Sequence, residues 1–464
     1  MPIGRASSDP RLSRWSGGLA LYLYLPIAAA AQPTVTWGDP TTPAGFIGYV
    51  LRSNYGSLSL SLGVKSGSVI GQWVAYGLDL LGVFLVVGVF LAMVGSMRLL
   101  RRDPAAAVAL GLAFLVAGPL FAAYANPDLS DPINQGILQR FYILPAIPVG
   151  ILAGIEVLGS LDALIERLGR ARPAARPGLA AAALLVMALP VASVAAHGPA
   201  LDQNGNTVAQ SHAEDLLRTL PTRAILLMRG DENYTGVSYV QRVEGFRTDV
   251  AAMDVELLKV PAYVVVTKRL HPDVVIPWAS YQQGPRGSLK DLVAANIGTH
   301  PVFFVGQMAE ANWDAAWDEV HAGLVRELVP KGQGGDGYAL LRTNKDAIAA
   351  LSFPDRRYPA TTWESLICEH YGVAAFDLAY ALQSGADAQA QGPLVEQMYR
   401  TAIRLANPTT IPAAFKNLGI LLQSEGGDRA EILSLWEQYV ALAPEAPDVG
   451  QIRQQITRLG GAAP

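Results

Sequence analysis

Long apolar runs alternate with polar segments over the first two hundred positions of the chain. Four of these runs have about 18 or more mostly apolar residues, the length that crosses roughly 30 Å of hydrocarbon; they cover residues 72–97, 105–124, 141–159 and 178–196. The stretch Leu80–Val94 contains no charged residue. A buried core helix has a similar composition, but four such runs in close succession are typical of membrane spans.

Residues 17–31 form a shorter apolar stretch that allows two interpretations. A basic segment precedes it and small residues, Ala28–Ala31, end it, as in a cleaved signal peptide. The other interpretation, which we favour, is the outer end of a membrane helix. The sequence therefore predicts a membrane domain of about five spans in residues 1–200.

The basic residues between the runs predict the orientation. Arg98, Arg101 and Arg102 separate the first two long runs, and arginines between 167 and 176 separate the last two. Basic loops stay in the cytoplasm. We therefore expect a multi-pass protein of an inner (plasma) membrane, with everything after residue 197 extracytoplasmic, which in a bacterium is the periplasm or the cell exterior.

A different pattern begins after residue 200. Short β-branched runs predict strands at 224–228, 250–255, 263–268, 302–306 and 338–342, and helical stretches lie between them at 235–243, 289–296 and 313–320. This alternation predicts an extracytoplasmic α/β domain at 201–357, with a parallel or mixed sheet. The loop Lys331–Gly337 is rich in glycine but lacks the strand-before, helix-after context of a phosphate loop.

Residues 358–464 predict an all-α tail. Tyr399–Pro408 and Leu435–Pro444 occupy equivalent places in helical segments 36 residues apart, close to the period of about 34 in tetratricopeptide repeats. About two such repeats are fewer than the three usually needed for independent stability, so we expect them to lean on the α/β domain.

Composition fits a protein with membrane and water-soluble parts. Hydrophobic residues make up 51% of the chain and charged residues 16%, and the net charge of -4 argues against nucleic acid as the main partner. The single cysteine, Cys368, excludes an internal disulfide and is typical of a small buried side chain. The scattered histidines show no metal-binding spacing, and no pattern predicts a cofactor.

Candidate chemistry lies first in Thr36–Gly56, an external loop with a tight turn at Gly38-Asp39-Pro40 and then an amphipathic helix along the membrane surface. The interpretation that we favour is structural packing under the soluble domain. The other is a cavity for a charged lipid head group, lined by Asp39, Arg52 and Tyr55.

A second candidate lies where a polar loop leads into the span at Arg140, Phe141 and Tyr142. An arginine at a membrane edge extends its charge to the interface, and it is also the residue type that binds phosphate bidentately. Asp79 lies inside a span, where an ionisable group is costly and therefore indicates a functional site.

Three segments carry a resemblance: WGDPTTPAGFIGYVLRSNYG, NQGILQRFYILPAIPVGILAG and LPTRAILLMRGDENYTGVSYVQRVEGFRTDV. Over about residues 21–261 they resemble successive motifs of an uncharacterised bacterial membrane family related to the eukaryotic transmembrane O-mannosyltransferases, in the GT-C class of glycosyltransferases. The resemblance implies transfer of a sugar from a polyprenyl-phosphate donor to an acceptor on the outer face of the membrane.

The resemblance also implies roles for residues. It places Trp37, Gly38, Asp39 and Tyr55 in an external loop beside the active-site cavity. Arg140 and Tyr142 are expected near the lipid phosphate, and the motif residues Gly230, Asp231 and Tyr239 in the soluble domain near the membrane.

The chain departs from the GT-C pattern at its start. These enzymes carry their catalytic acid in the first external loop, after the first of many spans, whereas this sequence begins about halfway through that architecture. The catalytic residue is therefore unassigned; Asp39 is a weak candidate for the base.

We expect the C-terminal half of a membrane glycosyltransferase, inactive alone. Three explanations stay open: a separate N-terminal catalytic chain completes it, the start of the sequence was misassigned, or the chain is a relic without activity. The rival hypothesis is a non-catalytic membrane-anchored scaffold that binds a protein partner through its helical repeats, and a third is a transporter subunit.

Overall fold

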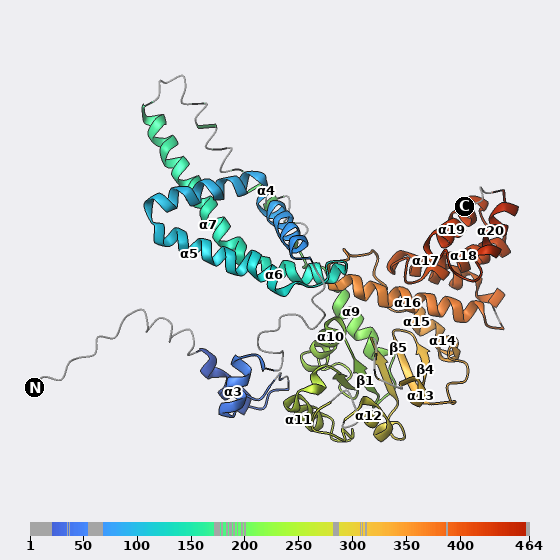
Figure 1. The fold of residues 1–464 in the computed structure, drawn as a ribbon. Coiled ribbons are helices and arrows are strands. Elements are labelled where there is room, and N and C mark those ends of the chain that lie inside the picture. The colour runs from blue at the N-terminus through green and yellow to red at the C-terminus, as the bar shows by residue number, and fades with distance from the viewer. Residues whose placement is uncertain are drawn as a thin grey trace, which may run out of the picture. The chain divides into compact units, whose positions relative to one another are not determined.

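The computed structural model describes residues 21–34, 36, 38–53, 68–170, 202–281, 287–306, 308, 310, 313–386 and 388–460, with isolated positions between 177 and 201. The chain divides into two compact units, drawn with the whole chain in Figure 1. We call Leu58–Asn206 with Ala360–Thr362 the membrane-helix unit. The sheet unit consists of Met1–Ser57, Thr207–Pro359 and Trp363–Pro464.

The membrane-helix unit contains three helices that are long and apolar enough to cross a membrane: Val69–Arg102, Pro104–Ala125 and Pro132–Arg167. The first is α4, the second runs from α5 (Pro104–Leu115) through the π-helical turn Val116–Leu120 to α6 (Phe121–Ala125), and the third lies in α7 (Pro132–Arg170). These three confirm the apolar blocks predicted at 72–97, 105–124 and 141–159.

The two remaining predicted spans stay predictions. The block at 178–196 lies outside the described residues apart from isolated helical positions. The described part of 17–31 forms a short 3-10 turn, Leu21–Leu23, followed by α2 (Tyr24–Ala30), which is too short to cross a membrane by itself.

Helix ends in the membrane-helix unit follow from local sequence. The Ser68 hydroxyl accepts from the Gly71 N–H at the start of α4, and Asp103 accepts from the Ala106 N–H at 3.0 Å at the start of α5. Pro104 occupies the first turn of α5, where its missing N–H is not needed. α4 is kinked at Leu85, whose φ is 56°.

Helices α4 and α7 pack closely at two points. A Cβ on Gly95 would lie 1.9 Å from the Leu152 carbonyl oxygen, so only glycine allows this approach. One turn further, Arg98 Nε lies 2.9 Å from Glu156 Oε2, and the Ser160 hydroxyl donates to Glu156 Oε1 at 2.7 Å. Small residues and a satisfied ion pair are what close helix packing in lipid requires.

The sheet unit is built on five strands in the order β2-β1-β3-β5-β4. Their bounds are β1 Ile225–Met228, β2 Ala251–Asp254, β3 Val302–Val305, β4 Trp317–Ala322 and β5 Val325–Pro330. β1 runs parallel to β2 and β3, β5 is antiparallel to β3, and β4 is antiparallel to β5. Every residue of β1, β2 and β3 is buried, as expected for parallel strands covered by helices.

Helices cover this mixed sheet, which Figure 1 shows at the centre of the unit. They are α9 Val208–Arg218, α10 Asp231–Arg242, α11 Pro261–Leu270, α12 Leu289–Asn296, α13 Trp313–Ala316, α14 Ala339–Thr343 and α15 Lys345–Ala349, with a 3-10 turn at Leu257–Lys259. The mixed sheet that the alternating pattern predicted is confirmed.

Three predicted elements were wrong or incomplete. The valine-rich run 263–268 lies in α11, where Pro261 starts the helix and buried Tyr263, Val264 and Val266 face the core. Residues 338–342 belong to the helical turn α14, and the predicted helix 313–320 gives way to β4 at Trp317. Strand β5 was missed altogether. A short apolar run fits the period of a helix as well as that of a strand, so only its packing in the fold distinguishes the two.

The C-terminal part of the sheet unit is helical. Its helices are α16 Trp363–Gln383, α17 Gly392–Leu405, α18 Pro412–Glu425, α19 Arg429–Leu442 and α20 Val449–Arg458, each packed on the next. Gly419 lies against the buried Trp436 ring, whose Nε1 donates to the Lys416 carbonyl at 3.2 Å. Cys368 is buried. The tetratricopeptide assignment stays a prediction.

Candidate functional site

A cavity of about 610 Å³ lies between α4 and α7 in the membrane-helix unit. Most of its lining residues are apolar, and four carry polar groups: Asp79, Gln135, Gln139 and Tyr142. The lining residues are Gly71, Val74, Ala75, Leu78, Asp79, Leu129, Gln135, Leu138, Gln139 and Tyr142. The size is within the range of roughly 300–1,000 Å³ for small-molecule sites.

Asp79 of α4 and Gln139 of α7 are polar residues in the lining of this cavity. Gln135 lies one helical turn from Gln139, so both amides face the same side. Carboxylate and amide groups accept and donate hydrogen bonds, which suits a ligand with hydroxyl groups.

Tyr142 forms the inner wall and is only 4% exposed. Its ring meets Tyr76 edge-on at a centroid distance of 4.9 Å, and Tyr76 in turn lies 6.0 Å from Phe114. These aromatic contacts fix the position of Tyr142 between three helices.

Arg140 is placed differently from Tyr142. It is exposed and is not part of the cavity wall. Residues two positions apart on a helix point to different sides, so α7 cannot present both to the same spot. The structure therefore places Tyr142 in the cavity, and the expectation that Arg140 shares a phosphate with it stays a prediction.

The turn at Asp39 belongs to the sheet unit and is explained by local structure. Asp39 Oδ1 accepts from the Thr41 N–H at 3.0 Å, and the Thr42 hydroxyl caps α3 (Pro43–Val50) by accepting from the Gly45 N–H at 3.0 Å. A Cβ on Gly45 would lie 1.9 Å from the Asp39 carbonyl oxygen. The motif GDPTTPAG therefore encodes a tight turn into a capped helix.

Asp39 is exposed, and hydrogen bonds from the Thr41 hydroxyl and N–H hold the pKa of its carboxyl below the usual value. A carboxylate with a low pKa is a weak base at neutral pH. It is better suited to accept a hydrogen bond than to remove a proton.

The other residues predicted beside Asp39 are not gathered there in the described part of the chain. Arg52 follows the far end of α3, about 12 Å along the helix axis from the turn. Trp37 and Tyr55 lie outside the described residues.

The motif residues Gly230, Asp231 and Tyr239 lie at and after the junction of β1 and α10. Gly230 has φ 105°, which only glycine adopts readily, and Asp231 begins the helix, where its charge favours the helix dipole. Tyr239 is 51% exposed two turns later. The first two residues shape the turn, and Tyr239 is a surface side chain.

Negative charge collects at this carboxyl edge of β1 and β2, the edge at which parallel sheets usually bind ligands. Burial raises the pKa of Asp254 to about 6 and also raises the pKa of Glu232. Arg229 pairs with Glu256 at 2.8 Å. In the described residues no group of three acidic, histidine or cysteine side chains is arranged for a metal ion.

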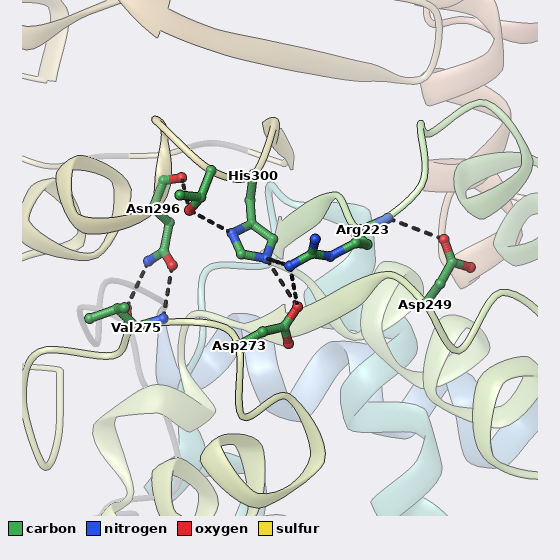
Figure 2. A network of polar contacts seen from close by, with 7 residues as sticks. Arg223, Asp249, Asp273, Val275, Asn296 and His300 are labelled. Atoms are coloured by element: carbon green, nitrogen blue, oxygen red, sulfur yellow. Dashed lines mark hydrogen bonds and ion pairs between the residues drawn. The ribbon is translucent and has the colours of Figure 1, made fainter.

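The opposite, amino edge of the sheet carries the polar network shown in Figure 2. Asp273 Oδ2 lies 3.0 Å from Arg223 Nη2 and 3.2 Å from His300 Nε2, and Thr299 Oγ1 lies 2.9 Å from His300 Nδ1. Asn296 holds both the N–H and the carbonyl of Val275. An acid, a histidine and a hydroxyl meet here, but His300 is 3% exposed, so the network ties loops together.

Backbone amides of the glycine-rich loop Lys331–Gly337 bind a carboxylate of the protein itself. The N–H groups of Gly332 and Gly334 donate to Asp318 Oδ2 at 2.7 and 3.1 Å, and Lys331 pairs with Asp318 Oδ1 at 2.9 Å. An internal carboxylate therefore occupies the place that a phosphate would need. This agrees with the weak phosphate-loop signal in the sequence.

Sequence reasoning identified Asp79 but missed Gln135 and Gln139. Their four-residue spacing at the start of a long apolar helix was the available signal. It also missed Arg269 of α11, which donates to residues 32 and 33; no local pattern marks that contact.

Comparison with known proteins agrees with the resemblance seen in the sequence. The family described as TMEM260-associated domain 2 matches residues 209–331, from α9 to just past β5. The mouse (Mus musculus) Protein O-mannosyl-transferase TMEM260 is 31% identical over 268 residues, which cover 57% of this chain and 37% of the relative. The chain is homologous to the TMEM260 proteins.

The Dictyostelium discoideum Protein O-mannosyl-transferase tmem260 is 23% identical over 384 residues, which cover 77% of this chain and 46% of the relative. The chain thus spans less than half the length of the curated TMEM260 relatives it matches. Both are eukaryotic, and the bacterial source expected from the sequence stays a prediction. No solved structure matches the chain.

Proposed function

We propose that the chain acts in membrane-bound transfer of a sugar from a polyprenyl-phosphate donor to a hydroxyl of an acceptor protein, as part of a GT-C-like glycosyltransferase. The observation that carries this proposal is the 31% identity to a protein named as an O-mannosyl-transferase. The relatives' activity is extended here to a chain that spans less than half their length.

The cavity between α4 and α7 supports the proposal. A polyprenyl chain is apolar and suits the exposed side chains of these helices, such as Val86 and Phe90. The sugar hydroxyls find an acceptor in Asp79 and both a donor and an acceptor in Gln139. Asp79 would repel a phosphate, so we place the sugar, not the phosphate, beside it.

The predicted topology completes the proposal. Because basic residues stay in the cytoplasm, we expect the end of α4 that carries Arg98 and Arg102 on the cytoplasmic side and the cavity end of α4 on the outer side. In this arrangement the sheet domain at 201–357 and the tetratricopeptide-like tail at 358–464 are extracytoplasmic.

The first experiment measures donor binding, which does not depend on turnover. The full chain is purified in detergent, and bound lipid is identified by mass spectrometry, alone and after addition of a polyprenyl-phosphate mannose. We expect the added lipid to be retained. Retention of ordinary phospholipid alone would contradict the proposal.

Variants of the lining residues test whether the donor lipid binds in the cavity between α4 and α7. Asp79→Asn removes the charge and Gln139→Leu removes the amide, and each is expected to weaken donor binding about tenfold, the loss of one hydrogen bond. Asp162→Asn, an exposed site on the same helix as Gln139, is the control. Equal retention in all three variants would exclude the cavity as the donor site.

The second experiment measures transfer of labelled mannose to acceptor protein. It uses the chain alone and the chain co-expressed with the part of a TMEM260 relative that lies outside the match. We propose that the chain alone is inactive and that transfer occurs in the co-expressed pair. Transfer by neither preparation would overturn the proposed activity.

A second candidate function rests on the helical tail. The successive pairing of α16 to α20 is an arrangement typical of helical repeats that bind peptides. A chain that captures a protein partner through residues 363–458 and retains no donor lipid is a membrane-anchored scaffold.

A further inference from the structure

A second cavity, of about 320 Å³, lies within the sheet unit. The segment after α2 forms one side and helix α11 forms the other. Its lining includes small apolar side chains, among them Ala29, Ala262 and Val265. Asp39 and Arg269 both lie in its wall. At this volume it suits a single residue-sized group and not a long lipid chain.

Arg269 builds this cavity by joining two distant parts of the chain. Its Nη1 donates to Gln32 Oε1 at 2.9 Å, and its Nη2 donates to the Gln32 and Pro33 carbonyls at 2.8 and 3.1 Å. A guanidinium has five N–H groups, and these three contacts use three of them. The remaining two can donate to a ligand.

Asp39 contributes a hydrogen-bond acceptor, in contrast to the donor groups of Arg269. Its Oδ1 is occupied by the Thr41 hydroxyl and N–H, which hold the carboxylate in place. An ionised carboxylate only accepts hydrogen bonds, and a guanidinium only donates them. A complementary ligand therefore offers an O–H group, a carbonyl and a small apolar part.

We infer that this cavity is a subsite for a serine or threonine residue of an extended acceptor polypeptide. The side-chain hydroxyl donates to Asp39, the backbone carbonyl accepts from Arg269, and the threonine methyl group packs on Ala262 and Val265. This inference rests on the proposed function and adds the acceptor side to it.

Other ligands fit less well. A phosphate or carboxylate is repelled by Asp39. Val265 is 67% exposed, so the cavity is open enough for a polypeptide to pass over it.

The test uses two blocked amino acids and the full chain in detergent. N-acetyl-threonine N′-methylamide and its valine analogue have nearly the same shape, and only the first has a hydroxyl. Saturation-transfer NMR measures binding of each. We expect the threonine compound to bind about tenfold more tightly, the difference that a hydrogen bond to a charged acceptor makes.

Variants separate the two contacts. Asp39→Asn keeps an oxygen for the Thr41 N–H and therefore the turn, but it should reduce the preference for threonine to about twofold or less. Arg269→Lys should weaken binding of both compounds. Lys268→Ala, the neighbouring position outside the lining, is the control and should change neither.

Hydrogen exchange of residues 29–41 in Arg269→Lys shows whether the segment stays in place. Weaker binding with unchanged exchange supports a direct contact, and faster exchange with unchanged binding overturns it. Equal binding of both compounds to the unaltered chain, or displacement of threonine by methyl α-mannoside, also overturns the inference.

The results distinguish a failure of the acceptor subsite from a failure of the proposed function. Retention of polyprenyl-phosphate mannose with no preference for threonine removes the acceptor subsite and leaves the donor proposal intact. Threonine preference without donor retention removes the transferase proposal and the acceptor role that depends on it.

Discussion

The membrane-helix unit and the sheet unit are both rich in apolar side chains, but they bury them differently. In the most apolar stretches of the three long helices only 11%, 11% and 28% of residues are buried. In the sheet unit Ile225, Leu226, Leu227 and Met228 of β1 are all 0% exposed. The sheet unit makes its own apolar interior, whereas the long helices need lipid to complete theirs.

In both units, a buried carboxylate has hydrogen-bond or ion-pair partners from the protein. Glu156 of α7 is held by Arg98 and Ser160. In the sheet unit, Asp215 of α9 is 0% exposed, and its Oδ2 accepts from the Ser352 N–H at 2.6 Å and the Tyr371 hydroxyl at 2.8 Å. Charged groups therefore need protein partners in either surrounding, and only the apolar surface distinguishes the units.

The largest expected effect concerns the self-contained unit. Asp215→Ala leaves the buried Tyr371 hydroxyl without its acceptor and also removes the partner of the Ser352 N–H and of Arg218, which we expect to destabilise the sheet unit by about 3–5 kcal/mol. Hydrogen exchange of α9 and α16 in the full chain measures it. Asp314→Ala, an exposed aspartate, is the control. Similar exchange in both variants would show that Asp215 does not join these elements.

The next prediction tests lipid against water directly. Val86 of α4 and Val243 at the end of α10 are 74% and 68% exposed. Val86→Arg should cost about 2.5–3.5 kcal/mol of membrane insertion, since a charge enters hydrocarbon. Val243→Arg should cost almost nothing, because water already surrounds it. The membrane-inserted fraction after alkaline extraction measures both, and equal tolerance would refute the membrane assignment of α4.

A pH-dependent difference is expected in the sheet unit. Burial raises the pKa of Asp254 to about 6, so between pH 4 and 6 the folded state holds a proton that the unfolded state has lost. Stability from this group is therefore lost as pH rises through that window, on the order of 2–3 kcal/mol in total. Asp254→Asn has no charge to bury.

Below pH 4, hydrogen exchange in β2 should be equally fast in the variant and in the unaltered chain. Above pH 6 it should be slower in the variant. Leu257 N–H still has an oxygen to bind in this variant, since it donates to Asp254 Oδ1 at 2.7 Å. A constant difference across the whole pH range would contradict the raised pKa.

The smallest expected effect concerns helix packing in the membrane-helix unit. Gly95→Leu forces α4 away from the Leu152 carbonyl, and overpacking of this kind costs about 1–3 kcal/mol. Gly82→Leu lies on the same helix with nothing within 4 Å of a Cβ and should be harmless. Thermal aggregation of the detergent-solubilised chain compares them. If Gly82→Leu is the more damaging variant, the α4–α7 contact is not as described.

The sequence determined the features that depend on local composition. The apolar blocks at 72–97, 105–124 and 141–159 appear as helices because hydrophobic length alone sets a span. The runs at 224–228 and 302–306 form strands because a buried parallel strand is continuously apolar. Asp79 was recognised from its charge within an apolar run.

Tertiary structure decided what depends on distant partners. The run 263–268 has strand composition, yet it lies in α11 because its buried residues pack with helical spacing. Asp79 and Gln139 line one cavity from two different helices, and Arg269 donates to Gln32 across 237 positions. Periodicity reports only which face of an element is apolar, so pairing of polar groups between elements is set by the fold as a whole.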